Sequence, residues 1–125
     1  MRARKSDIPV AFESGRSYAR YTEGGDMDVG WEGWQAGRDA TPLFKGLPDD
    51  RCQVPHWGYM IKGRMRMKYY DHDEVINAGE VFYLPPGHIP VIEEDSEFVD
   101  FQPKGEVKKV FEVVFRNVEA MRKKG

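Results

Sequence analysis

Short runs of alternating apolar and polar residues, separated by turn residues, fill the middle of the chain. Within residues 64–70, Met65, Met67 and Tyr69 alternate with three basic side chains, which is typical of an antiparallel strand with one buried and one wet face. The turn at 71–73 makes 74–77 its hairpin partner. Further strands are predicted up to Gly63 and at 8–12, 18–22, 27–36, 81–84, 90–93 and 98–102. The pattern predicts an all-β fold, a small antiparallel barrel.

The apolar period changes after Pro103. Apolar residues then recur every three or four positions, as on one face of an α-helix: Val107, Val110, Phe111, Val114, Phe115, Val118 and Met121. We expect a helix over about 104–122 that closes the barrel bottom or caps a sheet face. The alternative is that part of its apolar stripe meets a second subunit. With a barrel core at about 27–103, residues 1–125 are predicted to form a single domain.

Composition narrows the class of protein. The chain has 125 residues, of which 40% are hydrophobic and 32% charged, as in a soluble globular domain. The net charge of −2 gives no field that would draw in nucleic acid or anionic lipid. No apolar run is long enough for a transmembrane helix, and the N-terminus lacks the apolar region of a secretory signal. One cysteine excludes an intrachain disulfide, so we expect a cytoplasmic protein.

Candidate metal ligands cluster at two strand ends. Cys52 and His56 precede one central strand, and His88 follows the Pro-Pro-Gly turn at 85–87. Thiolate and imidazole bind Zn, Fe, Ni or Cu, and Mn is a further possibility, with Asp50 as a fourth ligand. If no bulge intervenes, Asp50, Cys52 and His56 point the same way, into the barrel. We expect His56 and His88 to converge at one barrel mouth with Cys52 beside them.

Each of these residues has an alternative role. Cys52 can be a small buried core residue, or a covalent nucleophile with His56 four positions away. His88 can point to solvent or bond backbone. Without a metal, the two histidines can instead hydrogen-bond an organic ligand at the same mouth.

Apolar and aromatic side chains on the central strands are candidates for the wall of a small-molecule cavity: Trp57, Tyr59, Met65, Met67 and Tyr83. The alternative is that they fill the barrel interior. The long connection at 37–50 is either a lid or rim of the site, or a loop packed on its own apolar side chains.

The segment 52–102 resembles the cupins, a superfamily of small double-stranded β-helix barrels. Gly63 matches the glycine of the first cupin motif, which puts His56 at its glutamate and Cys52 and Asp50 at its two histidines. The second motif is matched by Gly79, Pro85 and Gly87, while Pro90 stands at its histidine and His88 two residues earlier.

The resemblance implies a jelly-roll-like antiparallel barrel with a metal or small-molecule site at its mouth. Three functions follow: a metal-dependent enzyme acting on a small organic molecule, a non-catalytic ligand-binding or sensor protein, or a structural dimeric barrel. Fold does not decide among them. Because such barrels commonly pair, we also expect a homodimer, with the strands at 8–12 and 18–22 as edges to cover or exchange.

Overall fold

A computed structural model gives the structure of residues 1–124. Its strands are β1 (Val10–Ser14), β2 (Ser17–Gly24), β3 (Met27–Trp34), β4 (His56–Lys68), β5 (Asp73–Asn77), β6 (Val81–Leu84) and β7 (Ile89–Pro103), followed by helix α1 (Glu106–Lys124). Short 3-10 turns lie at Lys5–Asp7, Thr41–Leu43 and Pro48–Asp50. The predicted antiparallel β fold with an α-helix at the C-terminus is confirmed.

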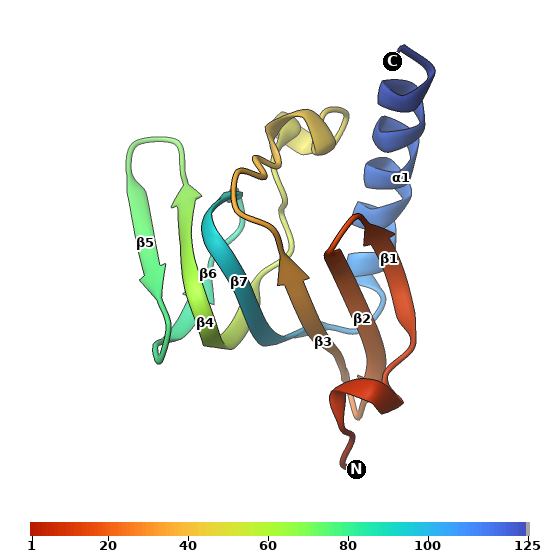
Figure 1. Cartoon of the computed structure of the whole chain (residues 1–125), viewed down its shortest axis with the longest axis vertical. Helices are drawn as coiled ribbons and strands as arrows, with labels where there is room; N and C mark the ends of the chain where they lie inside the picture. Colours follow the sequence, from red (N-terminus) through yellow and green to blue (C-terminus); the bar gives the residue numbers. More distant parts are fainter. Residues whose placement is uncertain (125) are drawn as a thin grey trace.

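The strands form one bent sheet in the order β1-β2-β3-β7-β4-β5, with β6 pairing beside β4, and all pairs are antiparallel. Figure 1 shows the strands fanning from β5 to β1, with α1 standing beside β1 and β2. In the described residues, β1 and β5 remain edges, so hydrogen bonding does not close the sheet into a complete barrel.

Two long bent strands, β4 and β7, replace the two pairs of shorter strands that the sequence predicts there. The register between them shifts three times around Gly63, whose φ is 90°. A Cβ at Gly63 would lie 2.3 Å from the carbonyl oxygen of Asp95, so only glycine fits this bend. The bulges reverse which residues of β4 point inward. Before Gly63 the inward residues have even numbers, such as His56 and Met60, and after it they have odd numbers, namely Met65 and Met67.

The interior has two apolar clusters. The distal core lies in the half of the sheet around β5 and contains Met60, Met65, Met67, Ile76, Phe82, Leu84, Ile92 and Phe98. The helix-side core lies beneath α1, where Val107 and Val114 are buried and Phe111 stacks at 6.0 Å from Phe12. The helix therefore caps the sheet, as predicted. Within residues 1–124, no helix is both long and apolar enough to cross a membrane.

The connection between β3 and β4 packs as a wall of the domain. Ala40 and Phe44 are buried in the helix-side core. The backbone N–H of Ala40 donates to the Pro90 carbonyl at 3.0 Å, and the Asn117 amide of α1 donates to the carbonyls of Leu43 and Lys45. These contacts match the packed-loop alternative of the sequence analysis.

Candidate metal centre

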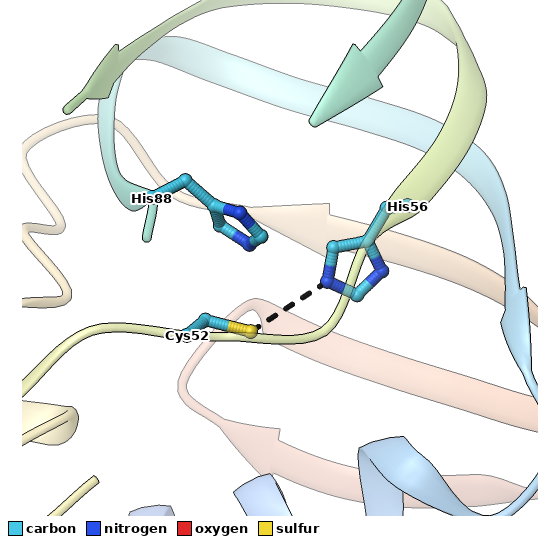
Figure 2. Close-up of side chains that lie close together, drawn as sticks. All are labelled: Cys52, His56 and His88. Atoms are coloured by element: carbon cyan, nitrogen blue, oxygen red, sulfur yellow. Dashed lines mark hydrogen bonds between the residues drawn. The ribbon is translucent and has the colours of Figure 1, made fainter. Parts of the chain in front are cut away.

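Three buried side chains that could bind a metal ion meet in the interior of the protein. Cys52 comes from the segment before β4, His56 is the first residue of β4, and His88 immediately precedes β7. A backbone bridge brings two of them together, because Cys52 N–H donates to the His88 carbonyl and Gly87 N–H to the Cys52 carbonyl. One ligand atom of each residue lies within 4.8 Å of the others, and Figure 2 shows the three side chains pointing toward one another. The expected convergence is present, but the group is buried rather than open at a mouth.

The hydrogen bonds of His56 leave one of its ring nitrogens free for a ligand. Gln102 Nε2 donates to the Asp28 carbonyl at 3.1 Å, which turns Gln102 Oε1 toward His56. His56 Nδ1–H then donates to that oxygen at 2.8 Å. The Nε2 lone pair is left facing Cys52, as in metal-binding histidines held by an outer partner.

His88 is held in the same way by the backbone. Its Nδ1–H donates to the Pro85 carbonyl at 2.8 Å, across the Pro-Pro-Gly turn. Nε2 is therefore the nitrogen available to an ion. The His56 and His88 rings meet edge to face with centroids 5.1 Å apart. His88 is buried, which excludes the alternative in which it points to solvent.

Burial keeps both imidazoles neutral. Loss of solvent, with a smaller contribution from His88, lowers the pKa of His56 to about 3. Burial also lowers the pKa of His88, against the hydrogen bond to Pro85. Neutral imidazole is the form that binds metal ions, so both ligands are ready near pH 7.

The Cys52 thiol is protonated in the metal-free protein. Burial raises its pKa to about 12, and Sγ lies 3.7 Å from His56 Nε2, to which the thiol can donate. A thiol with this pKa is a poor nucleophile, which argues against the covalent role. A metal ion would displace the proton and bind the thiolate.

The donor set fits a tetrahedral transition-metal ion. Bond lengths of about 2.3 Å to sulfur and about 2.0 Å to nitrogen imply donor separations of roughly 3.5 Å at tetrahedral angles. The Cys52–His56 distance of 3.7 Å is close to that value. Three protein ligands leave a fourth position for a small molecule, as in catalytic zinc sites.

Asp50 does not join this group. Its side chain is exposed and accepts a hydrogen bond from Gly46 N–H at 2.9 Å. Asp49 and Asp50 both have positive φ, near 57° and 56°. The chain turns there, so the strand phase that was expected to align Asp50 with Cys52 does not extend back to it.

Two buried carboxyl groups, Glu32 and Asp100, lie beside the candidate centre, and neither is among the site residues predicted from the sequence. Asp100 Oδ2 lies 3.6 Å from His56 Nδ1. Glu32 accepts hydrogen bonds from the Tyr21 hydroxyl and from Trp34 Nε1. Burial raises the pKa of Glu32, and burial together with the nearby Glu32 charge raises that of Asp100 well above its usual range. With His56 neutral, the contact of Asp100 with it is not an ion pair.

Gly30 makes room for the Asp100 carboxyl group. A Cβ at Gly30 would lie 2.2 Å from Asp100 Oδ1, an oxygen that has no hydrogen-bond partner among the described residues. Glu32 and Asp100 alternate inward with apolar outward neighbours on β3 and β7. That inverted alternation is the signal in the sequence that would have located them. Together the two groups can hold a proton at the cavity wall.

A cavity of about 110 Å³ adjoins the three donors. Its wall includes Glu32, Asp100, Met65 and Met67, and α1 supplies Val107, Val110, Phe111 and Val114. Met65 and Met67 thus line the cavity, as expected. A cavity of about 150 Å³ holds a benzene-sized molecule, so this space suits a smaller ligand.

Trp57, Tyr59 and Tyr83 lie on the opposite side of the sheet, so their predicted place in the cavity wall is wrong. All three are more than two-fifths exposed, and Trp57 and Tyr83 stack at 5.2 Å. Trp57 and Tyr59 share odd numbering with Met65 and Met67, but the bulges around Gly63 reverse the phase between them. Tyr83 pairs directly with Trp57 and therefore shares its face.

Comparison with solved structures identifies the fold. An EutQ ethanolamine utilization protein of Salmonella typhimurium aligns with a TM-score of 0.54 at 11% identity, covering 70% of this chain and 68% of its own. A cupin-2 domain protein of Shewanella frigidimarina aligns with a TM-score of 0.51 at 16% identity, over 74% and 85% of the two chains. Oxalate decarboxylase of Bacillus subtilis gives 0.57 at 21% identity.

The alignment covers 80% of this chain but only 28% of the decarboxylase chain. No protein-family model and no curated protein sequence matches the chain. At these identities the likeness shows the fold alone, and that fold is the cupin fold, as the motif spacing predicted.

Proposed function

We propose that this chain, which has the cupin fold, holds a divalent transition-metal ion with Cys52, His56 and His88 and acts on a small organic molecule in the adjoining cavity. The observation that carries the proposal is the meeting of three buried donor atoms within 4.8 Å. Groups of this kind are expensive to bury unless they bind something.

The donor chemistry narrows the choice of metal. One thiolate and two imidazoles suit Zn, Cu, Fe or Ni, whereas Mn prefers oxygen ligands. When bound, the ion would supply a Lewis acid beside the cavity. The chain's own groups hold the imidazole tautomers through Gln102 and Pro85 and exclude bulk water by burial.

The size and the lining of the cavity favour a ligand that is small and not strongly anionic. The decarboxylase with the same fold acts, by its name, on oxalate, which is a dianion. Here Glu32 and Asp100 face the cavity. The guanidinium of Arg38, which also lines it, donates to the Ser14 carbonyl instead. Carboxyl groups in a dry wall disfavour a second anion, so we propose a neutral or cationic ligand that can hydrogen-bond to Glu32.

Metal analysis of protein purified without a metal-binding tag tests the proposal. We expect about one equivalent of Zn, Cu, Fe or Ni in the parent protein. His56→Ala and His88→Ala should each lose most of it, because removal of a ligand typically costs more than the 10–100-fold lost with an outer partner. His72→Ala is the matched control, since His72 is exposed on the β4–β5 turn and bonds Asp71.

If the parent protein contains none of Zn, Cu, Fe or Ni, the metal centre is refuted. It is also refuted if both site variants bind as much metal as the parent. The two histidines would then be hydrogen-bonding groups for an organic ligand. A parent that binds metal but leaves the melting temperature unchanged across panels of neutral, cationic and anionic small molecules would contradict the small-molecule part alone.

A further inference from the structure

A carboxylate lies in the cavity wall without a positively charged partner. Glu32 Oε1 accepts a hydrogen bond from Trp34 Nε1–H at 2.9 Å, and Oε2 accepts one from the Tyr21 hydroxyl. Both bonds favour the ionised form of Glu32, against the effect of burial on its pKa. Within residues 1–124, no lysine or arginine forms an ion pair with Glu32 or with its neighbour Asp100. Because a buried negative charge without a counter-charge is costly, this wall favours a bound cation.

Asp100 adds a hydrogen-bond acceptor that lacks a donor. The residue is 2% exposed and lines the same cavity. Its Oδ1 has no hydrogen-bond partner among the described residues, and buried polar atoms of this kind are rare in folded proteins. A cation that carries N–H groups would supply the missing donor as well as the missing charge.

The proposed metal ion does not fill this role. Asp100 Oδ2 lies 3.6 Å from His56 Nδ1, whereas the metal position is on the other side of that imidazole, where Nε2 faces Cys52 Sγ. The ring of His56 therefore separates the ion from the carboxyl pair. A metal ion also has no hydrogen-bond donor to offer Asp100 Oδ1.

The rest of the lining suits an organic cation. The rings of Tyr21, Trp34 and Phe111 line the cavity, and Tyr21 and Phe111 meet edge to face with centroids 5.5 Å apart. Aromatic rings attract organic cations. Calcium and magnesium ions instead need about six or more oxygen ligands, and Glu32 and Asp100 are the only carboxyl groups in this lining.

We propose that the cavity binds a small primary ammonium ion, whose N–H groups donate to Glu32 and to Asp100 Oδ1 while its carbon chain contacts the aromatic and aliphatic wall. The proposal rests on the proposed function, because it assigns the charge and the donor group of the ligand in that same cavity, but it does not use the metal. The cavity of about 110 Å³ is smaller than one that holds benzene, so it limits the ion to about five non-hydrogen atoms.

Isothermal titration calorimetry of the full chain at pH 7 tests the proposal with probes of matched size. They are n-propylammonium, 1-propanol and acetate, with tetramethylammonium as a cation that has no N–H group. We expect saturable binding of n-propylammonium, with a dissociation constant at least tenfold lower than those of the other three. The alcohol lacks the charge, acetate has the opposite charge, and tetramethylammonium cannot donate to Asp100 Oδ1.

Glu32→Gln removes the charge at nearly constant shape, and we expect it to weaken n-propylammonium binding at least tenfold. Glu94→Gln is the matched control, because Glu94 is exposed, pairs with Arg64 at 2.7 Å and lies outside the cavity lining. This variant should bind the probe as the parent does. A circular dichroism melt verifies that both variants fold, and the ranking of the four probes on the parent protein decides the matter without them.

Three results would overturn the proposal: no binding of n-propylammonium at tens of millimolar, equal binding of any other probe, or parental affinity in folded Glu32→Gln. Elemental analysis of the same samples keeps the metal centre separate. Selective n-propylammonium binding by a parent without metal would support the ammonium site while refuting the metal centre. A metal-containing parent that prefers 1-propanol or acetate would overturn the ammonium site alone.

Discussion

The two halves of β4 have opposite polarity patterns. After Gly63, the strand is an ordinary one: Met65 and Met67 are buried in the distal core, and Arg64 and Arg66 face outward to ion pairs with Glu93. Before Gly63, the pattern is inverted. His56 points inward to Cys52, Asp100 and Gln102, while Trp57 and Tyr59 are exposed.

The difference separates stability from function within one strand. The distal half buries apolar surface and solvates charge, which stabilises the fold. The inverted half buries polar groups and exposes aromatic ones, and both choices cost stability in an isolated chain. We interpret them as the marks of an internal binding centre and an external partner.

Acidification should destabilise the inverted half through His56. Its folded pKa of about 3 is below the unfolded value, so the stability it contributes is present above about pH 6.5 and is lost as the pH falls toward 3. Integrated over that range, the loss approaches about 5 kcal/mol at 1.36 kcal/mol per pKa unit. Urea unfolding of metal-free protein between pH 7 and pH 4 should show about 3.4 kcal/mol of this loss, because that range covers about 2.5 of the pKa units.

The raised pKa values of Glu32 and Asp100 act in the opposite sense, because their contribution is present at low pH and declines as the pH rises. The difference between the parent and His56→Gln isolates the histidine. Parallel curves for the parent and His56→Gln would contradict a buried neutral His56.

Truncation of the distal core should lower stability without affecting metal content. Ile76→Ala removes a side chain of the distal core that is 3% exposed and lies away from the cavity wall, and such changes cost about 2–5 kcal/mol. Urea unfolding gives the loss, and elemental analysis of the folded variant gives the metal. Trp57→Ala should behave differently, because its side chain is 45% exposed on the other side of the sheet and its truncation should cost much less stability than that of a buried residue. Equal losses for the two variants would remove the contrast.

Gly63→Ala should disturb the bend that separates the halves. The residue has φ near 90°, and the new Cβ would meet the Asp95 carbonyl, so we expect a loss of about 2–4 kcal/mol. Gly79→Ala is the control, since its φ is 87° but no atom lies within 4 Å of the added Cβ. It should show only the conformational cost of about 1 kcal/mol. Equal losses in urea unfolding would show that the close contact at Gly63 is unimportant.

Removal of an outward-facing charge from the half of β4 after Gly63 should have the smallest effect on stability. Arg66 pairs with Glu93 at 2.9 Å on a solvent-exposed surface, where ion pairs contribute little. We expect Arg66→Ala to change the melting temperature only slightly, and the change to shrink further in high salt. A large, salt-insensitive loss would mean that this face too is more than a solvated surface.

The sequence predicts those parts of the molecule that depend on local patterns. The alternation at Met65 and Met67 locates a strand, the three-and-four spacing after Pro103 locates α1, and the spacing of Gly79, Pro85 and Gly87 indicates the fold. The convergence of Cys52, His56 and His88 follows from that register. Whether they bind a metal stays a prediction.

What the sequence does not reveal depends on non-local geometry. The bulges at Gly63 reverse the face of β4, which misplaces Trp57 and Tyr59, and no single residue type announces such a reversal. Glu32 and Asp100 become neighbours only when β3 pairs with β7. Asp50 is turned away by a local left-handed backbone conformation that aspartate adopts only occasionally.

Cobalt substitution tests the central claim most directly, because it reports the sulfur ligand itself. Reduced metal-free protein is titrated with Co²⁺ under anaerobic conditions, and its near-ultraviolet absorption is recorded. A bound ion should give a thiolate-to-cobalt charge-transfer band that saturates at one equivalent. Cys52→Ser should lose that band, while His72→Ala keeps it. Saturable binding without the band, or no binding at all, would contradict a metal centre built from Cys52, His56 and His88.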